Sequence, residues 1–154
     1  MAEDIWTTVR KGELLEDVLI VDCHAHLGPW YNFHIPGDPW ERGLLSAMDS
    51  CGINQVILAP MVGIGPDPVL GNELARKAVA SHTGRIFAYC TVNPNYPESE
   101  ILGELDSCFQ NEAFRAIKIH PATHDYPADG PCYRPVWDYA NEKHLPVLVH
   151  TWGG

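Results

Sequence analysis

Five short apolar runs, each bounded by polar or turn-forming residues, dominate the 154-residue sequence. They lie at residues 18–21, 55–59, 86–92, 116–120 and 146–150. Continuous apolar runs of this length are typical of strands that are buried on both faces, as in parallel sheets. Apolar residues at helical spacing lie between the runs, so strands and helices alternate and right-handed crossovers are expected. The sequence therefore predicts an α/β fold with a parallel sheet.

In the segments between these strands, several residues predict where helices begin and end. Asp38 and Pro39 predict the start of a helix, and Gly52 predicts its end. The segment 60–71 is rich in proline and glycine and is expected to be a loop, after which Asn72 caps the next helix. Further helices are expected within residues 4–16, 101–109 and 136–143, the first of them packing beneath the first strand.

The number of strand and helix units limits the possible architecture. A complete eight-unit barrel needs about 250 residues. Five units in 154 residues therefore correspond to a TIM-barrel-type (β/α) fold that is truncated after the fifth strand. An open, doubly wound sheet of five strands has the same periodicity and stays an alternative. For the barrel, we expect residues 1–154 to be the amino-terminal portion of a single domain. For the doubly wound sheet, we expect one small domain.

Charge and composition exclude several classes of function. The formal net charge of -10 and the pI near 5.1 disfavour binding to nucleic acid. Five cysteines without a Cys-x-x-Cys pair indicate neither a zinc ribbon nor a disulfide framework. The sequence contains no signal pattern and no run of about 18 apolar residues, which a membrane helix requires. We therefore expect a cytoplasmic protein with a small-molecule substrate, no nucleic acid and no membrane.

Histidines lie at the ends of the first and fifth predicted strands. His24 and His26 are two positions apart, so an extended backbone places both imidazoles on one side. His150 ends the fifth strand, and parallel strands bring their carboxyl ends to one face. Neutral imidazoles suit Zn²⁺, and catalytic zinc usually has three protein ligands and a position for water. The sequence therefore predicts a metal site with His24, His26 and His150 as ligands.

The other candidate site residues follow from their places at strand ends. Lys118 and His120 share one face of the fourth strand and are the candidate catalytic residues. His120 is expected to bind a substrate oxygen or to transfer a proton, and Lys118 to pair with Asp22 or to become a carboxylated ligand. Trp30 and His124 are the candidate substrate contacts, with a solvated loop position as the alternative for His124. A metal at this place would acidify water and favour hydrolysis.

Four motifs together resemble a known family. They are VDCHAHLG at 21–28, VNP at 92–94, AIKIHP at 116–121 and LPVLVHT at 145–151. In this order they resemble the amidohydrolase superfamily, and more narrowly the amidohydrolase 2 group related to aminocarboxymuconate-semialdehyde decarboxylase. The resemblance implies a TIM barrel, a divalent metal that is most often Zn²⁺, and hydrolysis of an amide, ester or lactone. Non-oxidative decarboxylation is the alternative reaction, and the motif positions support His24, His26 and His150 as ligands.

The resemblance also implies site residues beyond position 154. In the family pattern a histidine follows the sixth strand, and a metal-binding aspartate follows the eighth. A chain without that aspartate is expected to bind metal weakly and to be impaired, and a non-catalytic barrel fragment is therefore a further alternative. The first and fifth strands would then be apolar edges, which predicts a homo-oligomer or association through these edges.

Overall fold

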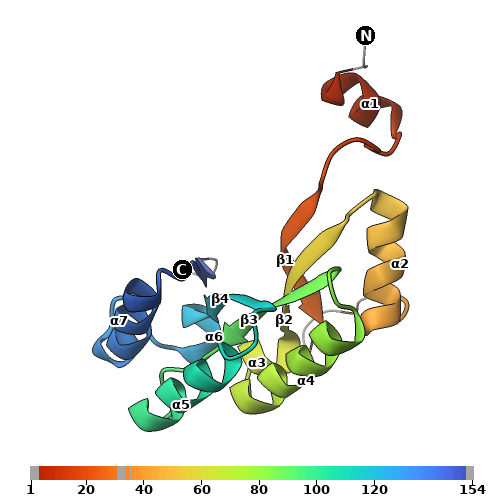
Figure 1. The fold of residues 1–154 in the computed structure, drawn as a ribbon. Coiled ribbons are helices and arrows are strands. Elements are labelled where there is room, and N and C mark those ends of the chain that lie inside the picture. Colours follow the sequence, from red (N-terminus) through yellow and green to blue (C-terminus); the bar gives the residue numbers. More distant parts are fainter. Residues whose placement is uncertain (1–3, 31–33, 35, 152–154) are drawn as a thin grey trace.

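A computed structural model describes residues 4–30, 34 and 36–151. Five parallel strands form one sheet in the order β1-β2-β3-β4-β5 (Figure 1). The strands are β1 (Val21–Leu27), β2 (Gln55–Pro60), β3 (Ile86–Thr91), β4 (Phe114–Ile119) and β5 (Val147–Val149). Each strand pairs with its neighbour in the sequence, whereas a doubly wound sheet reverses its strand order at a switch point. The incomplete TIM-type barrel is therefore confirmed, and the doubly wound alternative is wrong.

Helices follow the strands, and the longer helices cover one face of the sheet (Figure 1). The longer ones are α2 (Glu41–Cys51), α4 (Pro68–Ser81), α5 (Glu98–Cys108) and α7 (Arg134–Lys143). The shorter ones are α1 (Ile5–Lys11), α3 (Met61–Ile64), α6 (Pro121–His124) and the 3₁₀ turn η1 (Pro131–Tyr133). None of the helices in the described ranges is both long and apolar enough to cross a lipid bilayer.

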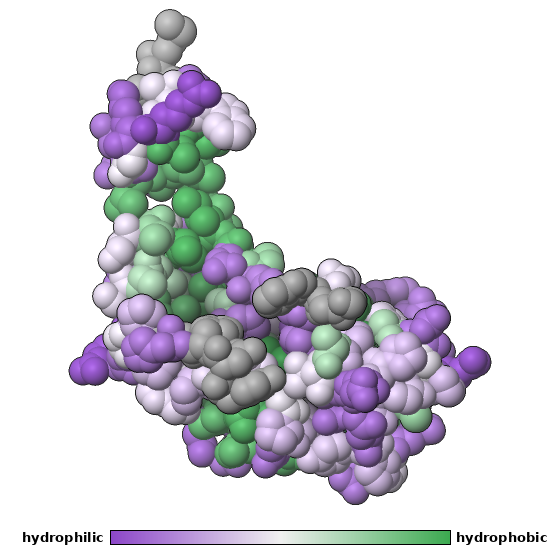
Figure 2. Space-filling model, turned by 180° about the vertical axis from the view of Figure 1, so that it is seen from behind, coloured by the Kyte–Doolittle hydropathy of each residue, from purple (hydrophilic) through white to green (hydrophobic). Residues whose placement is uncertain are grey.

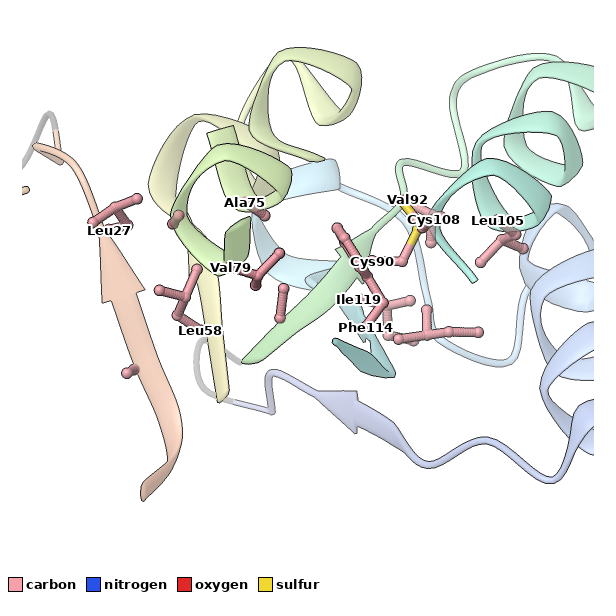
Figure 3. Close-up of a cluster of buried hydrophobic side chains, with 14 of the residues drawn as sticks. Leu27, Leu58, Ala75, Val79, Cys90, Val92, Leu105, Cys108, Phe114 and Ile119 are labelled. Carbon is pink, nitrogen blue, oxygen red and sulfur yellow. The ribbon is translucent and has the colours of Figure 1, made fainter. Parts of the chain in front are cut away.

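The main hydrophobic core lies between the sheet and these helices. Leu58 of β2, Cys90 of β3 and Ile119 of β4 pack against residues of α4 and α5, such as Ala75 and Leu105 (Figure 3). All five are fully buried. This burial fixes the three central strands against their helices and so fixes where their carboxyl ends lie.

A second, smaller cluster lies on the opposite face of the sheet. It contains Ala59, Tyr89 and Ala116, and partly buried Trp30 and Leu148 pack against it. Successive strand residues point to opposite faces. By this alternation His24, His26 and Lys118 belong to the face of the second cluster, which we call the inner face.

The start of β1 differs from the sequence expectation. A strand was expected at 18–21, but β1 begins at Val21 and itself contains both histidines of the predicted metal site. The reason is the pairing partner, because the ladder with β2 runs from Val21–Gln55 to Leu27–Pro60. Residues 18–20 precede this ladder. The Ile20 carbonyl accepts from the N–H groups of Asn54 and Gln55, and the Ile20 N–H donates to the Asn54 side chain at 2.7 Å.

Helix α4 begins before the expected cap. Its N-cap is Asp67, whose carboxylate accepts a hydrogen bond from the Leu70 N–H at 2.9 Å. Asn72, the expected cap, lies inside the helix and is fully buried. Its side chain accepts bonds from the N–H and hydroxyl of Thr91 and donates one to the Thr91 carbonyl. Asn72 therefore fastens α4 to the carboxyl end of β3.

Helix α1 does not pack beneath the first strand as expected. None of its residues is buried, and Trp6 is 74% exposed. The helix stands apart from the sheet at the end of an extended segment (Figure 1). Figure 2 shows an apolar surface along this segment, where Leu14, Val18 and Leu19 are exposed. Helix α1 therefore contributes no side chain to the core.

Candidate active site

The two histidines of β1 lie side by side on the inner face. Their ring centroids are 5.1 Å apart. The His26 ring lies with its Nδ1 at 3.1 Å from the backbone oxygen of Ala59 on β2, a distance at which an Nδ1–H donates. The opposite nitrogen of His26, Nε2, is then the one with a lone pair. The backbone N–H of His24 donates to the Asp22 carboxylate at 2.8 Å, which fixes the strand just before the pair.

Lys118 joins this pair from β4. Its side chain is 1% exposed, and its Nζ lies 3.3 Å from Nε2 of His24, although the two residues are 94 positions apart in the chain. Burial lowers the pKa of Lys118 to about 8. The expected ion pair with Asp22 is absent from the described part of the chain, where the Asp22 carboxylate accepts a hydrogen bond from the His24 backbone N–H. Carboxylation of Lys118 stays a prediction.

His120 and His150 form a second histidine pair at the ends of β4 and β5. Their rings stack at a centroid distance of 3.7 Å and an interplanar angle of 15°. Nδ1 of His120 accepts a hydrogen bond from the Thr123 N–H at 3.2 Å. A neutral His120 ring therefore carries its proton on Nε2. The backbone N–H of His150 donates to the Ile119 carbonyl at 3.1 Å, which continues the β4–β5 pairing to this pair.

Burial favours the neutral form of the His24, His26 and His120 imidazoles. It lowers the pKa of His26 to about 4 and the pKa of His120 to about 4, and repulsion between each imidazolium and the basic groups of Lys118 and His150 adds to the effect. The pKa of His24 is lowered for the same reasons, with burial the largest cause. Neutral imidazole is the form that binds metals. At neutral pH the inner face therefore presents metal-binding nitrogens together with one buried amine.

The donor chemistry fits a divalent metal, although the side chains are not arranged as a complete chelate. Within residues 4–30, 34 and 36–151, no three His, Cys, Asp or Glu side chains are grouped closely enough to hold an ion. His24 and His26 are neighbours, and His150 lies near enough to lower the pKa of both. The predicted set of His24, His26 and His150 thus stays a prediction, with imidazole nitrogens that suit Zn²⁺.

The two predicted substrate contacts lie in different surroundings. Trp30 is partly buried and packs against the inner-face cluster. His124 is only 6% exposed, so the solvated loop position considered for it is wrong. Its Nδ1 lies 3.0 Å from the hydroxyl of Tyr133. Substrate contact stays a prediction for both residues.

Two residues around the site were not anticipated from the sequence. The Tyr89 hydroxyl donates to the Cys23 carbonyl at 2.6 Å and ties β3 to β1 on the inner face. Tyr133 provides the partner of His124 from a turn nine positions later. Tyrosine within an apolar run signals core packing only, so neither hydrogen bond has a recognisable sequence signal.

Solved structures with the same fold include several enzymes. A 4-oxalomesaconate hydratase from Rhodopseudomonas palustris matches with a TM-score of 0.64 at 16% identity, over 86% of this chain and 52% of its own. A 2,6-dihydroxybenzoate decarboxylase in complex with 2,6-dihydroxybenzoate matches with a TM-score of 0.60 at 22% identity, over 88% of this chain and 50% of its own. A probable 2-pyrone-4,6-dicarboxylic acid hydrolase from Acinetobacter baumannii, with citric acid bound, matches with a TM-score of 0.57 at 11% identity, over 87% of this chain and 50% of its own.

The chain therefore spans about half the length of the solved structures that it matches. No curated protein matches the sequence. At these identities the likeness to the solved structures shows the fold alone. A family model described as Amidohydrolase, however, matches residues 21–153, which include all of the strands and every candidate site residue. The chain thus belongs to the amidohydrolase superfamily, in its amidohydrolase 2 group.

Proposed function

We propose that this protein is a metal-dependent hydrolase that acts on an amide, ester or lactone bond of a small molecule. The observation that carries the proposal is the grouping of His24, His26 and Lys118 on one face, with His120 and His150 stacked at the neighbouring strand ends. Because the chain spans about half of each matched structure, the reaction is proposed for a whole barrel of which residues 1–154 are the amino-terminal portion.

The metal would be held by the imidazoles of His24, His26 and His150. Amidohydrolases generally use a divalent metal, and nitrogen ligands of this kind favour Zn²⁺. A divalent ion bound there supplies Lewis acidity, which polarises a carbonyl group and acidifies water. The lowered pKa values of His24 and His26 support this assignment, because no proton has to leave these rings before metal binds at neutral pH.

The side chains of β4 would act on the substrate itself. His120 accepts through Nδ1, so its Nε2–H is the group that can donate to a substrate oxygen. Lys118 places a buried amine beside His24, where its cationic form would attract a carboxylate. Trp30 and the inner-face cluster provide an apolar wall that would exclude water from the bound substrate.

A carboxylate-bearing substrate fits both this amine and the known relatives of the fold. The names of the three matched enzymes describe oxalomesaconate, a pyrone dicarboxylic acid and a dihydroxybenzoate, each of which carries a carboxyl group. Decarboxylation is the second candidate reaction, because one of these enzymes, at 22% identity, is a decarboxylase. Hydrolysis and decarboxylation differ in whether CO₂ is released.

Zinc binding by the purified chain tests the ligand set. We expect His24→Ala and His150→Ala each to weaken zinc binding by at least about tenfold, measured by calorimetric titration with ZnCl₂. His82→Ala is the matched control, because His82 is the C-cap of α4 and lies at the end of that helix away from the site. Equal zinc affinity in the wild type and in both site variants would overturn the ligand assignment.

The reaction is tested with the complete barrel and small carboxylate-bearing lactones, esters and benzoates. We expect zinc-dependent hydrolysis, lost on chelation and restored by added ZnCl₂, without CO₂ release. Zinc-dependent CO₂ release would replace the hydrolase proposal by the decarboxylase alternative. Association through the outer strands β1 and β5 is tested by sedimentation of the 154-residue chain, which we expect to run as an oligomer.

A further inference from the structure

We propose that His124 is a positioning residue, which joins strand-end loops of the barrel and thereby holds the His120 imidazole with its donor nitrogen available to substrate. The role assigned to His120 rests on the proposed function. The structural part, the control of His120 by His124, does not depend on which substrate or metal is used.

The His124 side chain is part of a buried contact between α6 and the turn before α7. It is 6% exposed, and Tyr133 is completely buried. The Tyr133 hydroxyl lies 3.0 Å from Nδ1 of His124, within hydrogen-bond distance, and burial raises the pKa of this phenol, so Tyr133 stays protonated. Within the described ranges, Nε2 of His124 is a buried atom without a hydrogen-bond partner. The bond to Tyr133 orients the ring from the side of Nδ1, and the backbone at Ile64 and Gly65 also acts on the ring.

The backbone of His124 is fastened to a second loop. The side-chain amide of Asn95, in the loop that follows β3, donates to the His124 carbonyl at 2.9 Å. Asn95 is itself ordered by Asn93, whose side chain accepts from the Asn95 N–H at 3.0 Å. A third loop lies close by, because the backbone at Ile64 and Gly65 acts on the His124 ring and partly offsets the lowering of its pKa by burial. His124 thus lies where the loops after β2, β3 and β4 meet.

The short helix α6 connects His124 to His120. His120 is the N-cap of α6, and the Thr123 N–H donates both to its Nδ1 at 3.2 Å and to its carbonyl oxygen at 3.1 Å. The next residue, His124, donates its own N–H to the His120 carbonyl at 3.1 Å. A four-residue helix has few bonds of its own, so Thr123 stays beneath the His120 ring only while His124 is held.

The consequence for His120 is chemical as well as geometric. While Thr123 donates to Nδ1, the neutral ring has its proton on Nε2 and can donate from there. Without this bond, the ring can carry its proton on either nitrogen. A donor to a substrate oxygen would then be present for only part of the time.

Tyr133→Phe tests the proposal because it removes the hydroxyl and keeps the buried ring. Nitrogen-15 NMR of histidine-labelled chain reports which imidazole nitrogen of His120 is protonated. We expect a single Nε2–H form in the wild type, and a mixture of forms in the variant. We also expect hydrogen exchange at the Thr123 amide to become roughly tenfold faster, as for the loss of one hydrogen bond.

Tyr126→Phe is the matched control. Tyr126 lies in the same loop and its ring packs edge-on against Tyr133 at a centroid distance of 5.9 Å, but its hydroxyl accepts from the Cys132 N–H at 3.0 Å. We expect this variant to retain the single Nε2–H form of His120. An equal effect in both variants would overturn the proposal, because it would show that any loosening of the loop suffices.

Asn95→Ala provides a second test in case Tyr133→Phe does not fold. Asn95 is exposed, so its truncation leaves the core intact. We expect faster exchange at Thr123 and a mixed His120 signal here too. An unchanged His120 signal and unchanged Thr123 exchange in Asn95→Ala and in any folded Tyr133→Phe would overturn the proposal. Because these signals need neither metal nor substrate, a chain that binds no zinc but shows them would contradict the proposed function alone.

Discussion

The three central strands and the two outer strands differ in how firmly the fold holds them. In β2, β3 and β4 most residues are buried and helices α4 and α5 cover them. The three residues of β5 are only half-buried, and β1 begins with exposed Val21. The predicted metal ligands nevertheless lie on or directly after the outer strands, whereas Lys118 belongs to the central strand β4 and His120 directly follows it.

We therefore expect the central strands to provide most of the stability of the fold, whereas the outer strands provide the proposed metal ligands. The central strands fix Lys118 and His120 whether or not metal is present. Two of the predicted ligands contact these residues, namely His24 with Lys118 and His150 with His120. Substitutions in the two regions should therefore affect stability to different degrees.

Leucine truncation gives the largest expected contrast. Leu58 of β2 is fully buried, so Leu58→Ala should lower the free energy of unfolding by about 3 kcal/mol through lost burial and a cavity. Leu148 of β5 is half-buried, and Leu148→Ala should cost only about 1 kcal/mol. Urea denaturation measures both values. Equal losses would show that β5 is as firmly packed as the centre.

Acidification should weaken the central region through His124. Burial holds the pKa of His124 below its ordinary value, so the neutral form is favoured in the folded chain. As pH falls through about 6.5, the unfolded chain takes up a proton that the folded chain does not, and the free energy of unfolding falls. The loss stops once pH is below the pKa of the folded form. A single group changes stability by at most about 1.4 kcal/mol per pH unit.

Urea denaturation at pH 7.5 and at lower pH measures this effect. His24, His26 and His120 contribute in the same direction, since their pKa values are lowered too. His124→Gln isolates one contribution, because the amide does not titrate. We expect a shallower loss of stability with falling pH in this variant than in the wild type. Parallel pH profiles would contradict the assignment of a buried, neutral His124.

Substitution in α1 should have the smallest effect. Trp6 is 74% exposed and no residue of α1 is buried, so Trp6→Ala should change the free energy of unfolding by less than about 0.5 kcal/mol. The same denaturation experiment at several chain concentrations measures it. A loss that grows with chain concentration would show that Trp6 packs against a second copy, and that the outer region is stabilised by association.

The sequence predicted the strands well and some helix starts poorly. Strands β2 to β5 were expected from continuous apolar runs, because burial on both faces requires such runs. Asn72 precedes an apolar stripe and resembles a cap, but Asp67 followed by Pro68 caps the helix one and a half turns earlier. Asn72 is needed inside the fold to bind Thr91, and a bond between residues 19 positions apart has no local signal.

Sequence by itself determined the alternation of strands and helices, the family and the chemical type of the candidate site, because these depend on local periodicity and on motifs at strand ends. Only the tertiary structure decided the strand order, the contact of Lys118 with His24 in place of Asp22, and the burial of His124 against Tyr133. These features depend on which distant segments meet when the sheet curls. The physical reason is that a side chain's partners are set by packing in three dimensions, whereas its strand or helix is set largely by its neighbours in the chain.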